Sequence, residues 1–151
     1  MSNRFFLVGA AGVVVMWVMA SSIGAVAADS VSPRADRLFG EEQIDADYRV
    51  ARDRCNALSG NAGDVCVAEA KAKQRIAHAD ADAQVKDTPR ARYDARVVRA
   101  EAEYQVARER CGGDRGGAAK DTCLRDAQAA EARAKADANA DLHATESQSS
   151  R

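Results

Sequence analysis

The sequence predicts an all-α protein built of two tandem, disulfide-stapled helical hairpins. Three observations predict this fold class. After residue 28, Ala, Glu, Lys, Leu and Arg make up 61 of 123 residues, a composition typical of long helices. One sequence unit occurs twice, and each copy carries two of the four cysteines. Val, Leu, Ile and Phe account for only 15 of those 123 residues, so we expect a thin core that needs covalent support.

Residues 1–28 fit a secretory signal peptide. Arg4 precedes a long uncharged apolar run that ends in the small residues Ala25, Ala27 and Ala28. No cysteine follows this run, so we expect no lipid anchor. The run is also long enough for an uncleaved membrane anchor, and that alternative stays open. We expect cleavage, and a periplasmic or secreted mature chain that is free of the membrane.

Residues 32–87 and 88–143 are predicted to be two copies of one helical hairpin. Residues 32–55 align with residues 88–111 at an offset of 56, and 10 of the 24 positions are identical. The segments after the two loops align at an offset of 57, so one residue is inserted in the second loop. The two hairpins either remain semi-independent around the Asp87–Pro89 junction or collapse into a four-helix bundle.

The first helix of each copy is predicted from its cap and its apolar spacing. Ser32 and Thr88 are expected N-caps, and each is followed by proline, which suits a first helical turn. Gly40 is expected to start or bend the first helix near Glu41. Apolar residues then recur at spacings of four and three, which places them on one helix face. They are Ile44, Tyr48, Ala51 and Cys55 in the first copy, and Tyr93, Val97, Ala100, Tyr104, Ala107 and Cys111 in the second.

The returning helices have a face lined mostly by alanine. Glycines such as Gly60 are expected to end the preceding helices, and Asn61 or Asp64 is an expected cap in the first copy. In the second copy Asp114 or Asp121 takes that place. Residues 144–151 are polar and are expected to form a disordered tail. The alanine-lined faces comprise Cys66, Ala70 and Ala77 in the first copy, and Cys123, Ala127, Ala130 and Ala134 in the second.

The four cysteines are predicted to form the disulfides Cys55–Cys66 and Cys111–Cys123. An exported protein with an even number of cysteines favours disulfides, and each pair flanks its own turn within one copy. Facing positions on an antiparallel helix pair lie within disulfide reach. The short C-x2–4-C knuckles of zinc sites, the C-x-x-C of dithiol oxidoreductases and the C-x-x-C-H of haem attachment do not occur.

Two other groups of side chains are weak candidates for a site. His78 and Asp82 stand four residues apart in an Asp-rich helix and could bind a divalent ion weakly, although a solvated helix face is the favoured interpretation. Tyr48 and Tyr104 match across the copies and are each followed four residues later by arginine. Such a face could bind a partner, but we favour the interpretation that the tyrosines fill a core poor in large side chains.

Composition and motifs argue against several function classes. Without residues 1–28 the formal net charge is −2, so there is no basic surplus to neutralise nucleic-acid phosphates. No nucleophile–base pattern, phosphate loop or zinc-protease helix appears, and a narrow alanine-lined hairpin offers little room for a catalytic cavity. We therefore expect no enzyme, no metal and no cofactor.

The segment "CNALSGNAGDVCVAEAKAK" resembles a group of small exported bacterial proteins. These share a tyrosine, a Cys-x-Ala-Leu-Ser-Gly-Asn-Ala-x-Asp-Val-Cys turn and an Ala/Lys/Asp-rich helix. The resemblance covers most of residues 46–84 and extends more loosely to the second copy, whose loop departs from the pattern. It implies export and helical hairpins, and it implies no particular activity.

Three function hypotheses follow. The first is a structural or interaction protein of the cell envelope that contacts an unknown protein partner through exposed helix faces. The second is a small stress protein that binds unfolded clients through an exposed apolar patch. The third is a weak divalent-metal binder that uses the carboxylates from Asp80 onward. The oligomeric state is left open by the sequence.

Overall fold

The structure, a computed structural model, describes residues 33–113 and 116–151. It contains α1 (Pro33–Cys55), α2 (Gly60–Lys86), α3 (Pro89–Cys111) and α4 (Ala118–Ser149). No strand occurs in these two ranges, so the predicted all-α class is confirmed. The predicted signal peptide and the Ser32 cap lie outside the described residues. Among the described helices, none is long and apolar enough to cross a membrane.

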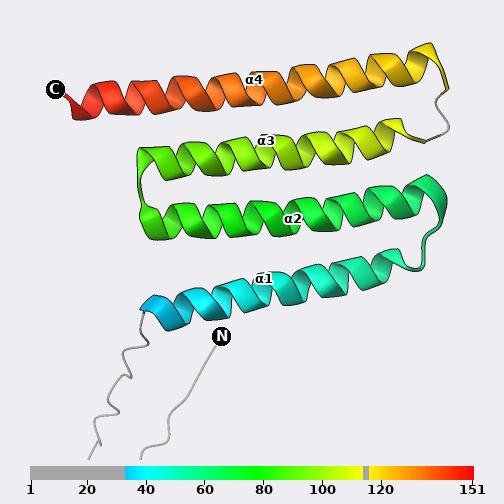
Figure 1. Ribbon diagram of the computed structural model, residues 1–151, viewed down its shortest axis with the longest axis horizontal. Helices are drawn as coiled ribbons and strands as arrows, with labels where there is room; N and C mark the ends of the chain where they lie inside the picture. Colours follow the sequence, from blue (N-terminus) through cyan, green and yellow to red (C-terminus); the bar gives the residue numbers. More distant parts are fainter. Residues whose placement is uncertain (1–32, 114–115) are drawn as a thin grey trace, which may run out of the picture. The chain divides into compact units, whose positions relative to one another are not determined.

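The helices run antiparallel in chain order, as Figure 1 shows. α1 begins at Pro33 and is continuous through Gly40, so the predicted start near Glu41 is wrong. Gly60 begins α2 instead of ending a helix, with a φ of 59° that glycine adopts without steric cost. Each hairpin is closed by its own disulfide, Cys55–Cys66 and Cys111–Cys123, with Cα atoms 5.5 and 5.7 Å apart.

A two-residue connection joins the hairpins and sets α2 antiparallel to α3. Asp87 ends α2 in the left-handed region, with a φ of 44°, and its amide donates to the carbonyl of Ala83. Thr88 is the N-cap of α3, as the sequence predicted, and its Oγ1 accepts from the amide of Ala91 at 3.1 Å. Arg92 pairs with the Asp87 carboxylate at 2.8 Å. A connection this short makes the joined helices neighbours.

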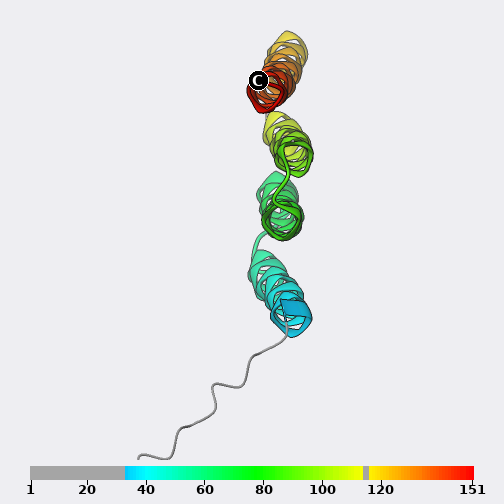
Figure 2. The same cartoon turned by 90° about the vertical axis from the view of Figure 1, so that its left-hand side faces the viewer.

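The four helices lie in a single layer. α2 packs against α1 and α3, and α4 packs against α3, whereas no other pair of these helices is in contact. Figure 2, turned by 90°, shows the helices in one column. The two hairpins are therefore packed together through α2 and α3, which answers the question that the sequence left open.

The layer follows from where alanines stand on the two central helices. Ala70 and Ala72 are both buried in α2, and Ala100 and Ala102 are both buried in α3. Two residues correspond to about 200° around a helix of 3.6 residues per turn, so each pair lies on nearly opposite faces. A helix that buries opposite faces has one neighbour on each side, which builds a layer.

The seam between α2 and α3 is made almost entirely of small side chains, and the sequence analysis did not find it. One cluster joins Ala72, Ala102 and Val106, and a second joins Ala83, Ala91 and Ala95. Small residues bury little area, since one methylene group contributes about 0.8 kcal/mol on burial. The seam therefore stabilises the fold weakly for its length.

α4 differs from the prediction at three places. Of its two expected caps, Asp114 lies outside the described residues and Asp121 lies in the first turn, because α4 has Gly117 as its N-cap. The helix continues to Ser149, so residues 144–149 are helical where a disordered tail was predicted. Extending a formed helix fixes few dihedrals per bond gained, and the hydroxyl of Thr145 also donates to the carbonyl of Asp141 at 2.8 Å. Ala130 is exposed, and the buried positions of α4 are Ala127, Ala138 and Leu142.

Candidate interaction surfaces

His78 joins α2 to α1. Its Nε2 lies 3.1 Å from Oδ1 of Asp45, and the same oxygen accepts a 2.7 Å hydrogen bond from Gln74. The hydrogen bond from Gln74, followed by that with His78, holds the pKa of the Asp45 carboxyl below its ordinary value. The polar cluster therefore helps to hold α1 and α2 together.

The Asp-rich stretch of α2 faces arginines on both neighbouring helices. Asp82 accepts from Arg37 of α1 at 2.6 Å and lies 3.7 Å from Lys86. Asp80 accepts from Arg99 of α3 at 2.6 Å. Within the described ranges no group of three or more His, Cys, Asp or Glu side chains is arranged to hold a metal ion. The carboxylates proposed as metal ligands thus connect helices.

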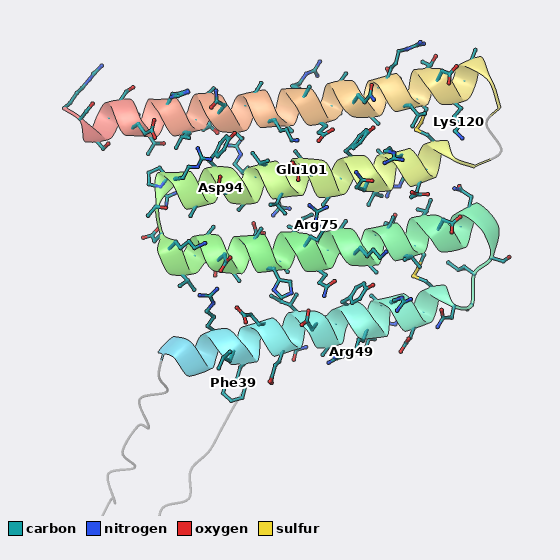
Figure 3. The ribbon with its side chains drawn as sticks, viewed as in Figure 1. Phe39, Arg49, Arg75, Asp94, Glu101 and Lys120 are labelled. Carbon is teal, nitrogen blue, oxygen red and sulfur yellow. A yellow bond between two sulfur atoms is a disulfide. The ribbon has the colours of Figure 1, made fainter. Side chains whose placement is uncertain are left out.

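Glu101 of α3 links three helices. Its carboxylate pairs with Arg75 of α2 at 3.4 Å and with Lys135 of α4 at 3.0 Å. Lys135 also pairs with Glu131 at 2.9 Å, the intrahelical pair that the spacing predicts. The hydrogen bonds to Glu131 and then to Glu101 raise the pKa of the Lys135 ammonium group. Figure 3 labels Arg75 and Glu101 on adjacent helices.

The two matched tyrosines lie at the seams within the hairpins. Tyr48 and Tyr104 are both half-buried. The guanidinium of Arg108 lies 5.8 Å from the centre of the Tyr104 ring, four residues back on the same helix. This position agrees with the interpretation that the rings fill a thin core.

Asn61 has a role that the sequence analysis did not find. It was an expected cap for its own helix, but the Nδ2 of Asn61 donates to the carbonyl of Glu109 at 2.6 Å. That carbonyl lies in the last turn of α3 and also accepts from the amide of the C-cap Gly112 at 2.9 Å. A Cβ on Gly113 would stand 2.9 Å from Oδ1 of Asn61, so glycine permits this approach. The first turn of α2 therefore holds the end of α3, which is the first helix of the second hairpin.

The outer edge of α1 carries exposed apolar side chains that the other described helices do not cover, with the polar Gln43 among them. Phe39 is 67% exposed and Val50 is 52% exposed. Figure 3 shows Phe39 pointing away from α2. Together with Ala46, these residues lie on the face opposite the one that packs on α2. We call Phe39, Ala46 and Val50 the α1 edge.

The outer edge of α4 is a row of exposed alanines. Ala129 and Ala136 stand two residues from the buried Ala127 and Ala138, so they lie on the side away from α3. Ala132 and Ala140 belong to the same exposed row. We call Ala129, Ala132, Ala136 and Ala140 the α4 edge.

Open grooves run between the helices. One, of about 390 Å³, lies between α2 and α3 and is lined by residues that include Ala72, Arg75 and Glu109. No polar or charged side chain among the described residues is buried. The grooves therefore lack the desolvated titratable groups typical of catalytic sites.

Fold and surfaces together define an all-α protein closed by two disulfides, with one layer of helices and two uncovered edges. No protein-family model, curated protein or solved structure matches the chain.

Proposed function

We propose that this protein is an exported, non-enzymatic helical protein of the cell envelope that works by binding another protein. The observation that carries the proposal is the pair of uncovered edges. A single layer protects α2 and α3 on both sides but leaves one side of α1 and one side of α4 without a helix partner. Apolar side chains exposed on an uncovered face of a small protein are typical of interaction sites.

Export is supported by the disulfides and by the N-terminal sequence pattern. Disulfides persist in oxidising compartments such as the bacterial periplasm, and reducing cytosolic conditions disfavour them. All four cysteines are paired in the structure. The charged start and the apolar run before residue 28 are the pattern of a secretory signal. The predicted duplication provides two related hairpins on which binding surfaces can be carried.

The non-enzymatic part of the proposal is supported by the contacts that the acidic side chains make. The carboxylates of Asp45, Asp80 and Glu101 each form ion pairs or hydrogen bonds between neighbouring helices. These carboxylates hold adjacent helices of the layer together. The edges, by contrast, offer apolar contact area with charged residues beside it.

Site-specific photocrosslinking in the periplasm tests this function. A photoreactive residue at Val50 or Ala129 is expected to give discrete protein adducts. One at Arg52, which is exposed on α1 but about 160° around the helix from Val50, is expected to give none. Adducts lost after treatment with reductant would connect the disulfides to binding. Absence of adducts at both edges would overturn the proposal, and a smear of many unrelated polypeptides would instead favour binding of unfolded clients.

A further inference from the structure

The seam between α2 and α3 shows what can cover an edge of this layer. The α2 face of that seam contains Ala72, Ala79 and Ala83, and the α3 face contains Ala95, Ala102 and Val106. Each face belongs to a different hairpin, so the seam is an interface between one hairpin and the next. Its two faces are distinct, since the end of one hairpin meets the beginning of the other.

Both edges occupy positions that the sequence offsets match to this seam. At the offset of 57, Ala129, Ala136 and Ala140 of α4 correspond to Ala72, Ala79 and Ala83 of α2. At the offset of 56, Phe39, Ala46 and Val50 of α1 correspond to Ala95, Ala102 and Val106 of α3. The α4 edge therefore matches the α2 face of the seam, and the α1 edge matches its α3 face.

From these matches we infer that the α4 edge of one copy binds the α1 edge of a second copy, head to tail. This deepens the proposed function, on which it rests, by naming the partner as another copy of this chain. The helix direction alternates along the layer, so α1 of the next copy would lie antiparallel to α4, as α3 lies antiparallel to α2. A head-to-tail interface leaves one free edge at each end of an open chain, to which further copies can bind. If the rotation between copies closes, the copies form a ring instead.

One of the three ion pairs between α2 and α3 has a counterpart of opposite charges beside the two edges. Arg110 of α3 pairs with Glu69 of α2 at 2.6 Å across the internal seam. The matched residues are Arg54 beside the α1 edge and Asp126 beside the α4 edge, so the pair of opposite charges is kept. Opposite charges across an interface fix its register and disfavour like-charged alternatives.

A second pair of opposite charges at the edges corresponds to two apolar residues of the internal seam. The register that brings Ala72 together with Ala102, and Ala83 with Ala91, sets Ile76 opposite Val98. The residues matched to these two are Arg133 on α4 and Glu42 on α1. Two copies joined head to tail would bring this arginine and this glutamate together.

The α1 edge exposes large apolar side chains at one end of the layer. Repeat proteins that stack a common unit carry a polar outer face on their terminal repeats. Here Phe39 and Val50 are more than half exposed on α1. The contact between copies is nevertheless weaker than the internal seam, because Phe39 is larger than the buried Ala95 to which it corresponds. In addition, Ala118, which corresponds to Asn61 at the offset of 57, cannot make the hydrogen bond that Asn61 donates to the carbonyl of Glu109. Association is therefore reversible and depends on concentration.

Sedimentation of the oxidised chain purified from the periplasmic fraction tests the inference. The wild type is expected to gain mass as its concentration rises. Val50→Arg blocks the α1 edge, and Ala129→Glu blocks the α4 edge. Each variant alone is expected to remain a monomer at every concentration. An equimolar mixture is expected to form a species of twice the monomer mass and nothing larger, because each variant keeps one complementary edge.

Matched control variants carry the same changes away from the edges. Val85→Arg alters an exposed valine of α2, and Ala130→Glu alters the exposed alanine next to Ala129. Both are expected to associate as the wild type does. Circular dichroism melting curves that match the wild type show that each variant is folded.

Each other outcome overturns the inference. A wild type that stays monomeric excludes it. Dimers of Ala129→Glu alone would show an α1–α1 contact, and dimers of Val50→Arg alone would show an α4–α4 contact. The self-association and the proposed function can fail independently. Crosslinks from Val50 to a different envelope protein, with no association of the pure chain, would support the proposed function and contradict the self-association.

Discussion

At the scale of single residues, polar side chains in this protein connect helices. Asp45 is the clearest case, because one carboxylate oxygen receives hydrogen bonds from both Gln74 and His78 of the neighbouring helix. The spacing of His78 and Asp82 suggested a possible ligand pair, but the structure directs these residues to Asp45 and Arg37 on α1. Sequence spacing reports neighbours on one helix and cannot report residues on the next one.

The lowered pKa of Asp45 predicts a loss of stability in acid. The folded state holds this carboxylate ionised more strongly than the unfolded state does, so its contribution is present above the unfolded pKa, near 4, and is lost as the pH falls below it. In Asp45→Asn, the melting temperature should fall less between about pH 6 and about pH 3 than in the wild type. Thermal unfolding followed by circular dichroism measures this difference.

Asp53→Asn is the control for that measurement, because Asp53 is an exposed aspartate on the same helix. We expect it to keep the acid sensitivity of the wild type. If Asp45→Asn loses as much stability in acid as the wild type does, the hydrogen bonds to Asp45 do not couple protonation to folding.

At the scale of helices, the central seam depends on side chains that are small. Ala102 is only 1% exposed at the contact between α2 and α3. A larger side chain there would force the two helices apart or leave its rotamer strained, because closely packed interiors respond to added methylene groups.

Ala102→Leu is therefore expected to lower the free energy of unfolding by about 1–3 kcal/mol. Urea denaturation of the oxidised protein measures the change. Ala130→Leu makes the same substitution at an exposed position of α4 and should stay within about 0.5 kcal/mol of the wild type. Equal effects of the two substitutions would show that the α2–α3 seam is loosely packed.

At the scale of the whole molecule, the disulfides compensate for a core of small side chains. The buried residues of the described chain are alanines, two cysteines, one valine and one leucine. Each disulfide closes a short loop, with sequence separations of 11 and 12. In the chain-entropy description, closing a loop of that length stabilises a protein by about 3 kcal/mol.

Replacing Cys55 and Cys66 together by serine, or Cys111 and Cys123 together, should each lower the free energy of unfolding by about 3 kcal/mol. Thermal unfolding of both variants, compared with the wild type in reductant, measures the effect. The wild type in reductant should melt below either variant, since it lacks both bridges. Variants that melt at the wild-type temperature would show that helix packing alone supports the fold.

Much of the fold could be predicted from the sequence, because the decisive signals were local. The all-α class came from composition, and Thr88 was predicted as a cap from its place before a proline. The disulfide pairing followed from two cysteines flanking one turn in each copy. The single apolar stripe on the first helix of each copy correctly placed Ala100 and Cys111 in the core.

Predictions from local sequence failed where they had to decide whether an alanine is buried or exposed. Ala130 was placed on the inner face of α4 by its spacing, but it is exposed. Ala72 and Ala102 escaped notice because alanine favours helix at any position, whether exposed or buried. Asn61 was assigned to its own helix because the partner carbonyl, that of Glu109, lies 48 residues away in the chain.

The sequence by itself determined that helices form, that each copy turns between its two cysteines and which cysteines pair, because composition, caps such as Thr88 and cysteine spacing act over a few residues. Only the tertiary structure decided that the hairpins pack through a second alanine face into one layer. Alanine faces allow two helices to approach closely, and this sequence has several such faces. The sequence alone therefore does not indicate which of them pack together. The layer then fixes which edges remain uncovered, and these edges carry the binding proposed for this protein.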